Sequence, residues 1–178
     1  MKQPDNIKPL ALVGMMGAGK TTLASLVAAK TGLKWFDLDA LIEKRLGCTI
    51  AEVFQRYGES FFRQEEHAAF MELLETAGSR YVLATGGGTP IYAPNADLLL
   101  SQFFTVWLDA PPTVLYKRAF SPTRPLASQG PSVFFRLAKE RHSQYDQVSQ
   151  FRVDVSARDA KDLANDVMRR WKEMQNGG

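Results

Sequence analysis

The sequence predicts an α/β fold in which a parallel sheet of five strands carries helices on both faces. Two observations predict it. Short apolar runs alternate along the chain with stretches of helical spacing, as in sheets whose parallel strands are joined by crossover helices. A glycine-rich loop also joins the first apolar run to the first helical stretch. With 178 residues, 45% of them hydrophobic and 23% charged, the chain is expected to form one domain, residues 1–178.

The first strand, loop and helix carry the most specific motif. Residues 14–22, Gly-Met-Met-Gly-Ala-Gly-Lys-Thr-Thr, match the pattern G-x-x-x-x-G-K-[ST], between an apolar run at 10–13 and helical spacing at 23–29. The glycines let backbone N–H groups turn toward an anion at the helix N-terminus. Lys20 would add a positive charge near the outer phosphates of a nucleotide, and the Thr21 hydroxyl can hold a magnesium ion. An ordinary glycine turn would not need Lys-Thr at this spacing.

The next strand, expected at residues 34–37, ends at a pair of acids, Asp37 and Asp39. Ligands of open α/β sheets bind beyond the carboxyl ends of the strands, so one acid could serve a metal and the other a substrate hydroxyl. The two would face the same way if the strand continued. Alternatively, Asp39 is only the N-cap of a helix expected at residues 40–46. The sequence alone leaves both interpretations open.

Two helices are expected next, at residues 49–57 and 59–76, separated by Gly58. In the second, Arg63 and Glu66 lie three residues apart and therefore one above the other. A surface salt bridge is the commoner meaning of such a pair. The two phenylalanines directly before Arg63 favour a pair at the edge of the core. A partly buried arginine held by a carboxylate is well suited to bind a carboxylate of a substrate.

A third strand, at residues 81–84, leads into three glycines, Gly86, Gly87 and Gly88. Three glycines in a row are unfavourable in backbone entropy, and a simple turn does not need them. Close approach of the backbone to a ligand is the better explanation.

The rest of the chain completes the alternation. Strands are expected at residues 104–108 and 151–155, and helices at residues 95–100, 111–119, 133–148 and 160–174. Between them, residues 120–131 are rich in Ser, Pro, Gly and Gln and are expected to form a mobile lid. Arg124 could reach a transferring phosphoryl group when this lid closes. The alternative is a solvated loop arginine.

Composition excludes several classes of protein. A single cysteine, Cys48, rules out an internal disulfide and favours a reducing, cytoplasmic location. No signal peptide or membrane span is expected. The net charge of +3 arises from interspersed acids and bases, which favours arginines around a small anion over a nucleic-acid surface. No Cys/His cluster suggests zinc.

These motifs together resemble the shikimate kinase family, a branch of the nucleoside-monophosphate-kinase-like fold. The resemblance covers nearly the whole chain and rests on an ordered set of motifs. They are the loop at 14–22, Asp37-Leu38-Asp39, Phe62-Arg63-Gln64-Glu65-Glu66, Thr85-Gly86-Gly87-Gly88, Arg124-Pro125-Leu126, and Arg141 with Tyr145. One departure is the absence of the proline that family members often have between Arg141 and Tyr145. The resemblance implies the strand order 2-3-1-4-5, a substrate-binding subdomain at about residues 39–77 and a lid at about 120–131.

The resemblance also implies the reaction, transfer of a phosphoryl group from ATP with Mg²⁺ to the 3-hydroxyl of shikimate. A monomer is expected, because a small kinase of this size can work alone. It implies nucleotide contacts at Gly17, Ala18, Gly19, Lys20, Thr21, Thr22, Arg118, Arg124 and Arg158. The metal would be held by Thr21 and Asp37. Substrate contacts are implied at Asp39, Arg63, Gly86, Gly87, Gly88 and Arg141, with Glu66 bracing Arg63. Lys20, Asp39 and Arg124 would be catalytic.

Three other functions remain to be weighed. A gluconate-type sugar-acid kinase would also need a phosphate loop and a carboxylate clamp, but the Asp-x-Asp, Gly-Gly-Gly and Arg-Pro-Leu motifs argue against it. A kinase-derived sensor without turnover would be expected to lack Lys20, Asp39 or an arginine, and all are present. A nucleic-acid-binding module ranks lowest, because the basic residues fall at site positions and form no patch.

Overall fold

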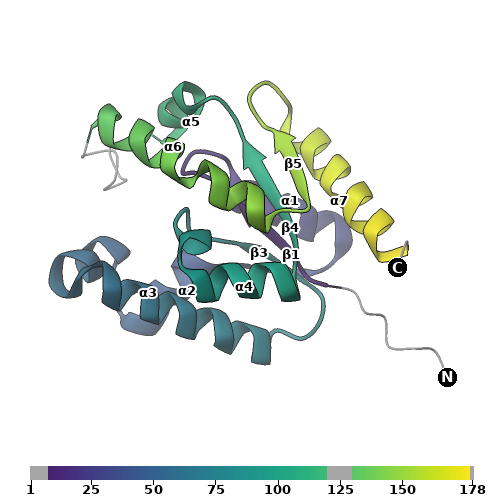
Figure 1. Ribbon diagram of the computed structural model, residues 1–178. Helices are drawn as coiled ribbons and strands as arrows, with labels where there is room; N and C mark the ends of the chain where they lie inside the picture. Colours follow the sequence, from purple (N-terminus) through teal and green to yellow (C-terminus); the bar gives the residue numbers. More distant parts are fainter. Residues whose placement is uncertain (1–7, 120–129, 177–178) are drawn as a thin grey trace.

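The computed structural model describes residues 8–119 and 130–176, which form a sheet flanked by helices (Figure 1). The strands are β1 (Leu10–Val13), β2 (Lys34–Asp37), β3 (Tyr81–Ala84), β4 (Phe104–Asp109) and β5 (Phe151–Asp154). The helices are α1 (Lys20–Thr31), α2 (Leu38–Leu46), α3 (Ile50–Thr76), the short 3₁₀ helix η1 (Thr89–Ile91), α4 (Ala93–Gln102), α5 (Pro112–Ala119), α6 (Pro131–Val148) and α7 (Ala160–Asn176).

All four strand pairings are parallel, and the order across the sheet is β2-β3-β1-β4-β5. The strand order implied by the family resemblance is therefore confirmed. The central strand β1 pairs on one side through Leu10 with Val82 and on the other through Leu10 with Phe104. The chain passes from β1 to β2 on one side and from β3 to β4 on the other, so the strand order reverses at β1, and ligands of such sheets bind beyond the carboxyl ends of the strands at this point.

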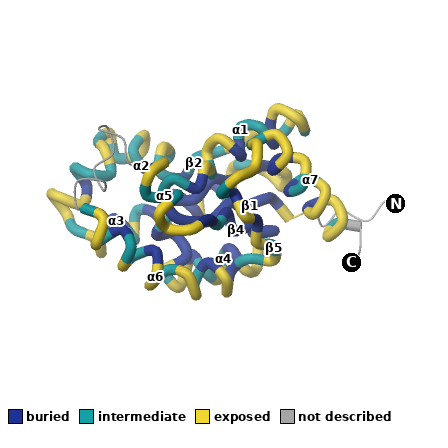
Figure 2. The backbone as a smooth tube through the Cα atoms, turned by 90° about the horizontal axis from the view of Figure 1, so that it is seen from above, coloured by how far each residue is buried: buried dark blue, intermediate teal, exposed yellow. Residues whose placement is uncertain are grey.

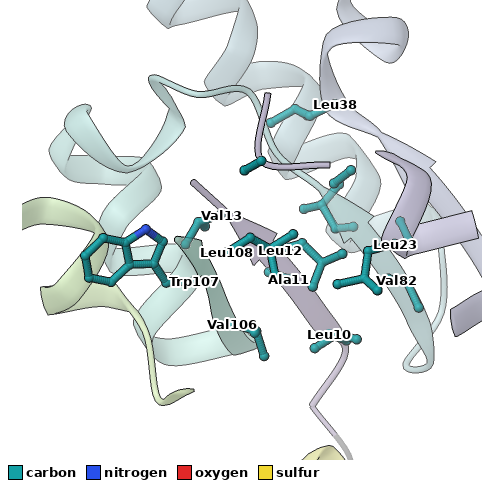
Figure 3. Close-up of a cluster of buried hydrophobic side chains, with 14 of the residues drawn as sticks. Leu10, Ala11, Leu12, Val13, Leu23, Leu38, Val82, Val106, Trp107 and Leu108 are labelled. Carbon is teal, nitrogen blue, oxygen red and sulfur yellow. The ribbon is translucent and has the colours of Figure 1, made fainter. Parts of the chain in front are cut away.

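Helices cover both faces of the sheet, as predicted. Helices α1 and α7 contact each other on one face, and α4 and α6 contact each other and β4 on the other (Figure 1). All residues of β1, β3 and most of β4 are buried, so the sheet lies in the interior of the molecule (Figure 2). Figure 3 shows side chains of β1 and β4, including Leu12, Val13 and Leu108, packed together at its centre.

Helix α3 contains the break that the sequence predicts. It begins at a capping box, in which Glu52 N–H donates to Thr49 Oγ1 and Thr49 N–H donates to Glu52 Oε2 at 2.8 Å. At Gly58 the backbone leaves the helical region, with φ 79° and ψ 178°, a conformation that favours glycine. The two predicted helices therefore follow one another directly across a kink and extend as one long element, α3, past the sheet (Figure 1).

The structure corrects the expectation for the acids after β2. The strand does not continue beyond Asp37, and α2 starts at once with Leu38, which is fully buried. Asp37, and not Asp39, is the N-cap, accepting a hydrogen bond from Ala40 N–H at 3.3 Å. Burial of Leu38 draws the helix start forward by two residues, so Asp39 lies in the first turn of α2.

Within residues 8–119 and 130–176, no helix is both long and apolar enough to cross a membrane. The predicted lid, except for its last two residues, lies outside the described part of the chain, and so does Arg124.

Candidate active site

The predicted site residues come from the carboxyl ends of neighbouring strands. The glycine-rich loop follows β1, Asp37 ends β2, and Gly86–88 follow β3. Since these three strands are adjacent and parallel, their ends meet at one edge of the sheet. Parts of the chain that are more than seventy residues apart, such as Gly14 and Gly88, are thereby brought together.

The loop after β1 adopts the conformation that its glycines predict. Gly14 and Gly17 have φ of 141° and 82°, and a Cβ on either would overlap a backbone carbonyl oxygen, that of Leu108 or Leu115. Both positions therefore require glycine for conformation and for space. The Lys20 ammonium donates to the carbonyl oxygens of Gly14 at 2.7 Å and Met15 at 3.0 Å, which places its charge over the loop.

Thr21 and Asp37 form a pair of oxygen ligands that fits a magnesium ion. The Thr21 hydroxyl donates to Asp37 Oδ2 at 2.7 Å, while Asp37 Oδ1 caps α2. Hydroxyl and carboxylate oxygens are the ligands that Mg²⁺ prefers, and it commonly takes one or two of them together with phosphate oxygens. Among the described residues, no group of three or more His, Cys, Asp or Glu side chains offers a metal site made by protein alone.

Asp39 has the most strongly perturbed carboxyl group of the site. Burial, and after it the nearby Asp37 carboxylate, raise the pKa of Asp39 to about 6, while Lys20 opposes the shift. A carboxyl group with a pKa near 6 can accept a proton more readily than an ordinary aspartate and is still ionised at neutral pH.

Each of the three glycines after β3 lies against one of the predicted substrate-binding side chains. A Cβ on Gly86 would lie 2.6 Å from Asp39 Oδ1, and one on Gly88 would overlap the Arg63 guanidinium. A Cβ on Gly87 would lie 3.6 Å from Arg141 Nη1, an ordinary contact. The glycine run therefore lets the backbone pass between three charged side chains from three different helices.

Arg63 and Glu66 form the partly buried ion pair that the sequence favours. Arg63 Nη1 donates to Glu66 Oε2 at 2.9 Å, the Glu66 side chain is fully buried, and only 12% of the Arg63 side chain is exposed. Arg63 Nη2 also donates to the exposed carboxylate of Glu59, and its guanidinium lies 5.1 Å from the centre of the Phe62 ring. Glu66 thus holds the guanidinium through Nη1, while Nη2 faces Glu59 at the surface.

Tyr145 links α6 to the glycine run. Its hydroxyl donates to the carbonyl oxygen of Gly87 at 2.6 Å, and burial raises the pKa of Tyr145 to about 12, so the phenol keeps its proton. Arg141 precedes it by one helical turn. The stretch between them, which lacks the family proline, lies inside the continuous helix α6, where proline would remove a backbone hydrogen bond.

A cavity of about 260 Å³ is lined in part by the phosphate-binding loop. Its lining includes Gly17, Ala18, Gly19, Thr22, Arg118 and Arg158. Arg118 donates to the carbonyl oxygens of Val155 and Ser156, both at 2.8 Å, and so ties α5 to the loop after β5. Arg158 pairs with Asp166 at 2.7 Å.

Comparison with known proteins decides the family. The family model described as Shikimate kinase matches residues 16–172 of this chain. The chain belongs to the shikimate kinase family. The family therefore makes the protein a phosphotransferase, and the resemblance inferred from the motifs is confirmed.

Relatives in the shikimate kinase family match along nearly their whole length. The chain is 36% identical to the shikimate kinase of Symbiobacterium thermophilum, over 95% of this chain and 99% of the relative. It is 37% identical to that of Nitrosococcus oceani, over 93% and 88%. Among solved structures, the shikimate kinase from Acinetobacter baumannii in complex with shikimate has a TM-score of 0.85 and 33% identity, over 94% and 96%. A gluconokinase from Sinorhizobium meliloti, with a TM-score of 0.62 and 16% identity, shares the fold alone.

For this member of the shikimate kinase family, the structure brings most of the predicted site residues to one edge of the sheet. Asp39, Arg63 and Arg141 surround the glycine run, and Lys20, Thr21 and Asp37 lie beside it. Arg118 and Arg158 lie apart from these, at the cavity of about 260 Å³. A larger cavity of about 610 Å³ is lined by residues of β4, α5, α6 and β5, together with Met15 of the phosphate-binding loop.

Sequence reasoning did not single out three polar side chains that complete the surroundings of Glu66 in this family member. Thr89 Oγ1 donates to Glu66 Oε1 at 2.7 Å, Asn95 Nδ2 donates to Glu66 Oε2 at 3.3 Å, and His67 Nδ1 lies 2.8 Å from Asn95 Oδ1. They come from η1, α4 and α3. Only the fold brings these three side chains together. The one local signal in the sequence was Asn95, a polar residue among apolar ones at the start of α4.

Proposed function

We propose that this site transfers the γ-phosphoryl group of ATP to the 3-hydroxyl of shikimate, releasing shikimate 3-phosphate and ADP. Membership of the shikimate kinase family supports the reaction. The single observation that carries the assignment of residues is the glycine run, where the backbone of Gly86–88 passes against Asp39, Arg63 and Arg141. The carboxylate of Asp39 and the two arginines, placed around the glycine run, suit an acceptor that has both hydroxyls and a carboxylate.

The glycine loop and Lys20 bind the phosphates of ATP. Backbone N–H groups of Gly17, Gly19 and the start of α1 face an anion, and the Lys20 ammonium moves from the loop carbonyls to the outer phosphates. Thr21 and Asp37 would hold Mg²⁺, which when bound neutralises phosphate charge. Phosphoryl transfer needs positioning and charge neutralisation more than covalent help, and these residues supply both.

Asp39 orients the acceptor hydroxyl and takes its proton. The hydroxyl oxygen forms the new bond to phosphorus as the bond between phosphorus and the ADP oxygen breaks. The hydroxyl proton passes to the Asp39 carboxylate, whose pKa of about 6 suits a base that is ionised at neutral pH.

Arg63 and Arg141 bind the carboxylate of the acceptor. A guanidinium presents a planar fork of donors that matches a carboxylate with two parallel hydrogen bonds. Glu66 holds Arg63 Nη1 from the buried side, and a substrate carboxylate would take the place of the exposed Glu59 carboxylate on Nη2. The further roles of Arg124 on a lid, and of residues 39–77 as a subdomain, are proposed on the family resemblance.

The expected partners are small molecules. We propose a cytoplasmic monomer that binds shikimate and ATP with Mg²⁺, and that binds neither nucleic acid nor a membrane. The free thiol of Cys48 is consistent with a reducing compartment.

The test is release of ADP from magnesium-ATP with shikimate, gluconate, quinate or no acceptor. Release with shikimate alone supports both substrate and reaction. Release with gluconate in place of shikimate would keep the phosphate site and overturn the acceptor. If folded protein binds ATP but releases no ADP with any acceptor, the catalytic proposal is wrong and the protein is a sensor.

Replacing Arg63 by alanine is expected to raise the KM for shikimate at least tenfold and to destabilise the fold by about 3–5 kcal/mol. The second effect arises because the buried Glu66 charge loses its partner. The double variant Arg63→Ala, Glu66→Gln removes that stranded charge. It should therefore regain most of the stability, measured by denaturant unfolding, and keep the high KM. Recovery of the KM together with the stability would remove Arg63 from the substrate clamp.

A further inference from the structure

The Glu66 carboxylate is the centre of a buried hydrogen-bond network. Its side chain is fully buried, and so are Thr89 and Asn95, which both donate to it. With Arg63, three donors from three segments of the chain converge on two carboxylate oxygens. A buried carboxylate keeps one orientation only when its oxygens are satisfied in this way.

The network fixes the orientation of the Asn95 amide. Because an ionised carboxylate only accepts hydrogen bonds, the group 3.3 Å from Glu66 Oε2 must be the Nδ2 donor of Asn95. Asn95 Oδ1 then faces His67 Nδ1 at 2.8 Å, so this ring nitrogen must carry a proton. The hydrogen bonds therefore have one direction of donation, from His67 to Asn95 and from Asn95 to Glu66.

The same residues connect the clamp to the glycine run. Arg63, Glu66 and His67 lie on α3, Thr89 on η1 and Asn95 on α4. Thr89 N–H also donates to the carbonyl oxygen of Gly86 at 3.3 Å, which closes the turn that contains the three glycines. Gly88 in this turn leaves room only for the Arg63 guanidinium. A displacement of Glu66 would thus move both the Arg63 guanidinium and, through Thr89, the backbone of the glycine run.

We propose that Asn95 is a positioning residue for the substrate, with Thr89 as its partner. The two hold the Glu66 carboxylate in the one orientation that presents the Arg63 guanidinium to the carboxylate of the acceptor, and His67 keeps the Asn95 amide turned the right way. This inference rests on the proposed function of Arg63 and goes beyond it. Neither Asn95 nor Thr89 lines the phosphate-binding loop, so they act on acceptor binding and not on ATP binding.

The first test uses Asn95→Asp, which has the same shape but presents an acceptor where Glu66 needs a donor. We expect the KM and the calorimetric Kd for shikimate to rise about tenfold or more, because a buried acceptor loses its partner. The KM for ATP should stay within about twofold of the wild-type value, since the phosphate loop is unchanged. A KM for shikimate that stays near wild type, or a parallel rise of both KM values, would overturn the proposal.

A second pair of variants covers the case in which Asn95→Asp does not fold. Thr89→Val keeps the shape and removes the hydroxyl, whereas Thr89→Ser keeps the hydroxyl. Thr89→Val should raise the KM for shikimate by about three- to tenfold, and Thr89→Ser should restore it. Equal KM values in both variants would reduce Thr89 to a packing residue and overturn its share of the proposal.

A spectroscopic measurement tests the donor chain without any substitution. Long-range nitrogen–proton NMR correlations of the neutral His67 ring should show the proton on Nδ1. A neutral ring protonated on Nε2 would contradict the assigned direction. Turnover by the wild-type protein distinguishes failure of this inference from failure of the proposed function. If the proposed function is wrong, the wild-type protein releases no ADP with shikimate. If only this inference is wrong, wild-type activity is intact.

Discussion

Asp39→Asn is expected to lower kcat by about a hundred- to ten-thousandfold, the range typical for loss of a general base. The same substitution should make the protein more stable at neutral pH. The two effects have one origin, because burial disfavours the charged Asp39 carboxylate that the reaction uses. An asparagine has nearly the same shape and no charge to bury.

The size and pH range of the stability gain follow from the pKa. The folded state raises the pKa of Asp39 from 3.8 to about 6, so the folded state binds the proton more tightly than the unfolded chain. The ionised group therefore costs stability, by up to about 3 kcal/mol above pH 6, and this penalty disappears as the pH falls toward 4. Asp39→Asn should gain most at pH 7 and nothing below pH 4.

Denaturant unfolding of the ligand-free protein between pH 4 and pH 8, together with steady-state kinetics, checks both parts. Asp97→Asn is a matched control, because Asp97 is exposed on α4 and remote from the phosphate loop in the sequence. It should change neither kcat nor stability. A less stable Asp39→Asn variant at pH 7 would contradict the assigned burial of the charge, and an unchanged kcat would remove Asp39 from the chemistry.

Lys20→Ala is expected to lower kcat by about a hundred- to a thousandfold, the typical effect of deleting one group that stabilises the charge of a transition state. Its ammonium lies over the phosphate loop, within 3.0 Å of the carbonyl oxygens of both Gly14 and Met15. No other side chain in the loop carries a positive charge. The substitution should also move the pH dependence of the remaining activity to higher pH, because Lys20 lowers the pKa of Asp39.

Steady-state rates with saturating shikimate and ATP measure the first effect, and their pH profile measures the second. Lys30→Ala serves as the control, because Lys30 is an exposed lysine in the last turn of the same helix. It should behave like wild type. A Lys20→Ala variant with near-normal kcat would refute the assignment of the phosphate loop.

The sequence predicted the centre of the sheet because its central strands are buried on both faces and hence read as uninterrupted apolar runs. Residues 10–13 and 81–84 are of this kind, and the structure buries all of them. The phosphate loop was equally predictable, since its glycines and lysine act within one short segment. In both cases the sequence pattern that carries the prediction lies within one short segment of the chain.

Predictions from the sequence were weaker wherever the outcome depends on contacts between residues that are distant in the chain. The alternative that Asp39 caps a helix at residues 40–46 was wrong, because the burial of Leu38, which only tertiary packing decides, starts α2 directly after Asp37. Asn95 could not be assigned at all, because its partner Glu66 lies 29 residues away on another helix.

The glycine run has a consequence for attempts to redesign acceptor preference. Any side chain at Gly86 or Gly88 must push aside Asp39 or Arg63, so a library that randomises these two codons will return inactive clones for reasons unrelated to the new acceptor. Gly87 is different, because an added methyl group there makes only ordinary contacts, the nearest at 3.6 Å. Directed evolution of the acceptor site should therefore begin at Gly87, where an added methyl group leaves Asp39 and Arg63 in place.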